Sequence, residues 1–81
     1  MEDNPGIFLI MLGKNIARIR KERGLSQIDM ANEMEMDRSN LRRIEAGRTN
    51  PTTVTLHRIS KVLSVNFEEL FDFKENPKNK K

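Results

Sequence analysis

An 81-residue chain is long enough for one small domain and close to the lower limit for folding on a single hydrophobic core. Because it has no cysteine and one histidine, disulfides, cysteine-based zinc sites and histidine-rich metal sites are excluded. The net charge is +3, and residues 12–64 hold 11 basic side chains against 6 acidic ones, which favours a surface that faces a polyanion.

The apolar run Ile7–Leu12 (IFLIML) is much shorter than the roughly 20 residues that a helix needs to span a bilayer. An acidic start, with Pro5 and Gly6 before the run, and the lack of a small-residue cleavage site do not match a signal peptide. We therefore expect a cytoplasmic protein that has no membrane association.

Apolar residues recur at helical spacing along the chain, and no period-two alternation predicts a strand. A first helix is expected from about Leu9 to Arg23, after a lead-in over residues 1–8, because Gly24 suits a left-handed helix end. Ser26 can cap a second helix, from about Gln27 to Met34.

A three-residue connection (EMD) leads to a third short helix over about residues 38–46, with Asp37 as its N-cap and Gly47 as its end. Two short capped helices joined in this way form a helix-turn-helix, whose second helix enters the DNA major groove. The outward face of that helix carries four polar side chains: Arg38, Ser39, Arg42 and Arg43. Arginine near the start of such a helix can bind guanine at two points. The alternative is an ordinary solvated arginine face.

A fourth helix is expected from about Thr53 to Ser64, and a capping box of Asn66 and Glu69 opens a short fifth helix, Phe67–Phe73. Residues 1–73 are thus predicted to be one all-α domain, a compact bundle of five short helices. The basic tail, residues 74–81, has nothing to bury and is expected to be disordered.

Four spaced motifs, between about Leu12 and Phe71, resemble the lambda-repressor-like (Cro/C1, or XRE) helix-turn-helix family. They are R..RG.SQ, then Ala31, then R..L..IE.G..NP, then L..I...L.V. The resemblance implies a stand-alone, sequence-specific transcription regulator that binds double-stranded DNA as a homodimer. Because we find no nucleophile–base pair, phosphate-binding glycine loop or metal-ligand spacing, we expect no enzyme activity, cofactor or small-molecule ligand.

The resemblance also implies roles for nine residues. The principal base-facing positions are Arg38, Ser39 and Arg43, and those that contact either bases or backbone are Asn40 and Arg42. Phosphate contacts are implied for the start of the second helix and for the loop after the third: Gln27, Arg48, Thr49 and Asn50. Gln27 would also brace the recognition helix, and Arg20 and Glu45 match a pair that forms a buried salt bridge in some members.

Two positions depart from the family pattern. Glu35 stands where glycine is usual, so either it adopts a left-handed conformation, at a strain of about 1 kcal/mol, or the turn differs. Ile28 stands where a polar residue is usual, and it either packs under the N-terminal segment or is a lone exposed apolar side chain.

One module of this size buries only about 600–1,000 Å² on DNA, so specific binding needs two copies on neighbouring half-sites. Two surfaces compete for the dimer contact: the run Ile7–Met11 and the last helix with Val65, Phe67 and Phe71, of which we favour the last helix. The alternative function is a protein-interaction module of the same fold, such as an antitoxin or a transcription-machinery adaptor. Its binding would survive loss of the arginine face, whereas DNA binding would weaken steeply with salt.

Overall fold

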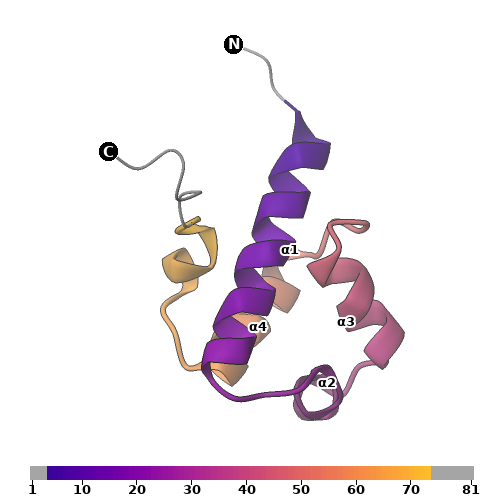
Figure 1. Ribbon diagram of the computed structural model, residues 1–81, viewed down its shortest axis with the longest axis vertical. Coiled ribbons are helices and arrows are strands. Elements are labelled where there is room, and N and C mark those ends of the chain that lie inside the picture. The colour runs from indigo at the N-terminus through magenta and orange to yellow at the C-terminus, as the bar shows by residue number, and fades with distance from the viewer. Residues whose placement is uncertain (1–3, 74–81) are drawn as a thin grey trace.

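Helices account for most of residues 4–73, the part of the chain that the computed structural model describes (Figure 1). They are α1 (Pro5–Glu22), α2 (Gln27–Met34), α3 (Arg38–Glu45), α4 (Thr53–Leu63) and the 3-10 helix η1 (Phe67–Phe71). The prediction of an all-α fold with a helix-turn-helix is confirmed. The expected disordered tail, residues 74–81, lies outside the described residues, so the division between domain and tail stays a prediction.

The start of α1 differs from the prediction, because residues 5–8 are its first turns rather than part of a lead-in. Asn4 caps the helix, since its side-chain Oδ1 accepts a hydrogen bond from the backbone N–H of Ile7 at 3.2 Å. Pro5 follows at the first helical position, where its missing N–H is not needed and its fixed φ suits the helix. The apolar run is therefore helical throughout, and α1 ends one residue before the expected Arg23.

The helix-turn-helix has the predicted boundaries to within one residue. Ser26 Oγ accepts a hydrogen bond from the N–H of Asp29 at 3.0 Å and so caps α2. Glu35 ends α2 in the left-handed region, with φ 55° and ψ 46°, so the turn keeps its usual form and a non-glycine residue bears the strain. Asp37 occupies the N-cap position of α3, but its side chain makes no capping hydrogen bond, contrary to expectation.

The C-terminal part is slightly shorter than predicted. α4 is capped by Thr52, whose Oγ1 accepts from the N–H of Thr55 at 3.0 Å, and it ends at Leu63. The last helix is a 3-10 helix that ends at Phe71 instead of Phe73. Its capping residue Asn66 donates its backbone N–H to Glu69 Oε1 at 2.7 Å, as the expected capping box requires.

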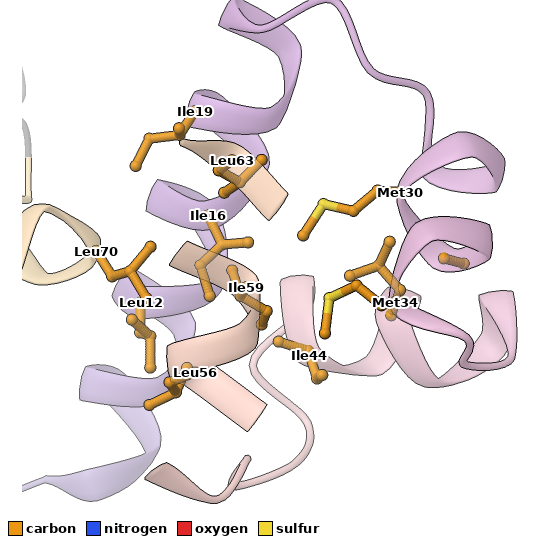
Figure 2. Close-up of a cluster of buried hydrophobic side chains, with 12 residues drawn as sticks. Leu12, Ile16, Ile19, Met30, Met34, Ile44, Leu56, Ile59, Leu63 and Leu70 are labelled. Atoms are coloured by element: carbon orange, nitrogen blue, oxygen red, sulfur yellow. The ribbon is translucent and has the colours of Figure 1, made fainter. Parts of the chain in front are cut away.

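The hydrophobic core lies between α1, α2 and α4, with contributions from α3 and η1 (Figure 2). Its fully buried large side chains come from all five helices: Ile16, Met30, Met34, Leu41, Ile59, Leu63 and Leu70. Each such side chain contributes roughly 1.5–3 kcal/mol by leaving water. Met30 and Met34 fill the space between α2 and the other helices.

Two glycines allow α1 and α3 to pack backbone against backbone. A Cβ at Gly13 would lie 2.5 Å from the carbonyl oxygen of Glu45, a distance that real Cβ atoms do not adopt. A Cβ at Gly47, which has φ 74°, would lie 2.6 Å from the Cα of Ile10. The end of α3 therefore rests directly on α1, and this contact sets the position of the recognition helix.

On the other side of α1, a buried amide joins it to η1. The side-chain nitrogen of Asn15 donates to the carbonyl oxygens of Glu69 and Leu70 at 3.1 and 2.7 Å. Asn15 Oδ1 in turn accepts from Arg18 at 2.6 Å, so every polar atom of the amide that is buried has a partner. η1 is thus fixed beside α1, as Figure 1 shows. None of the helices in residues 4–73 is long and apolar enough to cross a membrane.

Candidate nucleic-acid interface

The outward face of α3 is polar and free of the core. Its exposed side chains are those that the sequence assigned to DNA: Arg38, Ser39, Asn40, Arg42 and Arg43. Leu41 and Ile44 are buried on the opposite face, which holds the helix in place. Arg43 Nη2 donates to Asn40 Oδ1 at 2.8 Å, so one turn of the helix orients this guanidinium. In Figure 1, α3 lies at the edge of the molecule, away from η1.

Behind this face, Glu45 links three helices. Its carboxylate accepts from Arg20 of α1 at two points, Nε to Oε2 at 2.7 Å and Nη2 to Oε1 at 3.1 Å. Both side chains are more than nine-tenths buried, which confirms the predicted buried salt bridge. Gln27, the first residue of α2, donates its Nε2 to Glu45 Oε1 at 2.9 Å, and Arg20 also donates to the carbonyl of Leu25.

The place of Gln27 suits both implied roles. Its side-chain nitrogen is bonded to α3, so it braces the recognition helix as expected. It also begins α2, where the first backbone N–H groups of a helix have no partner within the helix. Ser26 satisfies only the N–H of Asp29, and the positive end of the helix dipole therefore faces outward beside α3.

The loop after α3 lies on the other side of the recognition helix. Arg48 and Asn50 are exposed and Thr49 is half-buried. Thr49 and Asn50 line one shallow depression together with Asn40 of α3. The fold thus brings together, around α3, all nine residues that the sequence assigned to the interface.

Sequence reasoning missed two residues beside this interface. Lys14 and Lys21 are exposed on α1 and line an open cleft of about 710 Å³ whose far wall includes Arg42 of α3 and Ala46, which follows that helix. Their spacing of seven residues places them on one face of a helix, which is a readable signal. The sequence alone did not show that this face lies along the recognition helix.

The remaining residues that the sequence singled out do not form a second site. His57, the histidine of the chain, is exposed on α4. Ile28 is a lone exposed side chain, 52% accessible, rather than part of a packed contact with the N-terminal segment. Within residues 4–73, no three acidic, histidine or cysteine side chains are grouped closely enough to hold a metal ion.

Comparisons with known proteins agree with this geometry. The family model HTH_3, described as helix-turn-helix, matches residues 16–70. The HTH-type transcriptional regulator y4dJ of Sinorhizobium fredii is 37% identical over 60 residues, which are 74% of this chain and 78% of the relative. The control protein C.MunI of a Mycoplasma species is 36% identical over 63 residues, 76% and 85% of the two chains. The crystal structure of the restriction-modification controller protein C.AhdI from Aeromonas hydrophila has a TM-score of 0.75 at 30% identity, covering 78% of this chain and 96% of that one.

Proposed function

This chain belongs to the helix-turn-helix family HTH_3 and is a DNA-binding regulator of transcription rather than an enzyme, and we propose that it binds a two-fold symmetric operator as a homodimer. In this proposal α3 enters the major groove of each half-site. The observation that carries it is the outward face of α3, on which three arginines stand clear of the core. The proposal also includes the cytoplasmic location that we expect from the sequence.

Arg38, Ser39 and Arg43 are the side chains that we propose for base edges. Arg38 begins α3, and residues near the start of a recognition helix reach deepest into the groove. Arg43 is held by Asn40, so its planar guanidinium loses little freedom when it bonds to guanine. A preference for guanine in each half-site follows.

Phosphate contacts are proposed on both sides of α3. The start of α2 with Gln27 would bind one strand through backbone N–H groups and the helix dipole. Arg48, Thr49 and Asn50 would bind the other strand from the loop after α3. Contacts of this kind set the register of the protein on the duplex, while α3 reads the sequence.

The two rival surfaces for dimerisation are neighbours in the fold. The ring of Phe8 stacks on that of Phe71, with centroids 6.2 Å apart and an angle of 11° between the planes. Phe8 also meets Phe73 edge to face, with centroids 5.7 Å apart, and Met11 lines a small depression with Phe73. The first turns of α1 and the end of η1 therefore form one surface, named here the aromatic patch: Ile7, Phe8, Met11, Phe71 and Phe73.

We propose that a second copy of the chain covers the aromatic patch. Ile7, Phe8 and Met11 are 43–55% exposed, whereas the exposed Ile28 and Val54 lie singly on other helices. Such a cluster of exposed apolar side chains is typical of an interaction site. A two-fold dimer brings identical patches together, so one surface is enough.

Selection of bound sequences from a random DNA pool tests the proposal. The wild type, Arg38→Ala/Arg43→Ala and the control His57→Ala/Lys61→Ala, which removes two exposed side chains from α4, are compared at one salt concentration. A symmetric site that is enriched by the wild type and the control but not by the arginine variant supports it. No enrichment by the folded wild type overturns it and favours the protein-interaction module, whose partner would bind the aromatic patch.

A further inference from the structure

The cleft between α1 and α3 has an excess of positive charge. Five basic side chains line it: Lys14, Arg18, Arg20, Lys21 and Arg42. Two of them are neutralised, Arg18 by Glu22 at 2.8 Å and Arg20 by the buried Glu45 at 2.7 Å. Among residues 4–73, no carboxylate lies within ion-pair distance of the other three. Lys14, Lys21 and Arg42 therefore leave the cleft with a charge of +3.

Of the two neutralised pairs, Arg20–Glu45 is buried in the lining of the cleft, whereas Arg18–Glu22 is partly exposed along α1. Because Glu45 is bonded at two points to Arg20 and at a third to Gln27, its charge is not available to the lysines above it. An anion entering the cleft thus meets three unpaired cations on exposed side chains, and the one exposed carboxylate of the lining, Glu22, is paired with Arg18. The cleft is wide open, which suits an extended polyanion better than a small molecule.

The position of the cleft indicates which polyanion. One wall is α3 itself, and Gln27 at the start of α2 stands at its edge, so the cleft continues directly into the proposed DNA interface. Arg42 belongs to both surfaces. A duplex whose major groove holds α3 brings one sugar-phosphate strand along each side of that helix. The strand on the α1 side would run past Lys14 and Lys21.

We infer that Lys14, Lys21 and Arg42 form a phosphate-binding cleft for the DNA strand on the α1 side of the recognition helix. The inference rests on the proposed function and extends it in two ways. It adds two residues of α1 to the contact surface. It also assigns Arg42 to the DNA backbone, whereas the family resemblance allowed a contact with either the bases or the backbone.

The dependence of operator affinity on salt concentration tests whether Lys14 and Lys21 contact DNA phosphates. Removal of one phosphate-binding cation makes the slope of log K against log salt shallower by about 0.9. Lys14→Gln and Lys21→Gln should each show this change, and the double variant about twice as much. Lys61→Gln on α4 is the matched control, because it removes the same charge from an exposed position outside the cleft. All three lysines are exposed, and thermal unfolding confirms that the variants stay folded.

Arg42 is tested by the sequence preference instead. Arg42→Gln should weaken binding to all sequences by a similar factor and leave the preferred bases unchanged, whereas Arg38→Gln should relax the preference at one position. A shift in the preferred base after Arg42→Gln would overturn its assignment to the backbone.

The outcomes separate this inference from the proposed function. If the wild type binds an operator but the cleft variants change the slope no more than Lys61→Gln does, the cleft is not a DNA contact and the proposed function stands. If the folded wild type binds no DNA specifically, both fail, and the cleft becomes a candidate surface for an acidic protein.

Discussion

Glu45 of α3 and Arg20 of α1 form a buried, two-point ion pair, with the shorter contact, Nε to Oε2, at 2.7 Å. Gln27 of α2 donates to the same carboxylate, so one side chain of the recognition helix is bonded to both of the helices beside it. The pair is therefore part of the support of α3 rather than of its DNA-facing surface. Its removal should affect folding first and DNA binding as a consequence.

Glu45→Ala should lower the free energy of unfolding by about 3–5 kcal/mol, because it leaves the guanidinium of Arg20 buried without a counter-charge. Urea titration followed by circular dichroism measures the change. Arg20→Met/Glu45→Ala should be more stable than Glu45→Ala alone, since it also removes the unpaired charge. If Glu45→Ala kept wild-type stability and bound DNA more weakly, the structural role would be wrong.

Gly13→Ala should destabilise the protein by roughly 1–3 kcal/mol, as overpacking in a close contact does. The added methyl group would meet the backbone carbonyls of Ile44 and Glu45, which cannot rotate away as a side chain can. Gly6→Ala in the same helix is the control, because its Cβ would meet only the side-chain oxygen of Asn4, at 3.3 Å. Thermal unfolding should show a lower Tm for the first variant and no decrease for the second.

Glu35→Gly should stabilise the protein by about 0.5–1 kcal/mol, because glycine adopts the left-handed conformation at the end of α2 without strain. Glu33→Gly is the matched control. It makes the same exchange inside the helix, where glycine costs about 1 kcal/mol. Opposite shifts of the urea midpoint are expected, and equal shifts would mean that the strain at Glu35 is negligible.

Ile7→Glu/Met11→Glu should weaken self-association at least tenfold, because it puts two charges into the aromatic patch. Sedimentation equilibrium measures the dimer dissociation constant. Ile28→Glu/Val54→Glu, which makes the same change at two isolated exposed positions, should leave it near that of the wild type. A larger effect from the second pair would move the dimer surface to α2 and α4.

Helix boundaries were largely predictable from the sequence because their signals are local. Ser26, Thr52 and the glycine at 24 each act within a few residues of the helix end that they define. The start of α1 is marked in the same local way, by Asn4 and Pro5, although the prediction placed it four residues too late. The choice of a 3-10 helix for residues 67–71 had no such marker.

The outward face of α3 could also be predicted, because the spacing of Leu41 and Ile44 determines which side of the helix is buried, while the DNA contacts of that face stay a prediction. What only the tertiary structure decided is which other residues lie beside that face. Gly13 lets α1 approach α3 closely enough to align Lys14 and Lys21 with Arg42, and Asn15 ties η1 to α1 so that Phe8 meets Phe71. These contacts join residues far apart in the chain. They depend on how the helices cross, and the spacing of apolar residues along one helix does not determine that geometry.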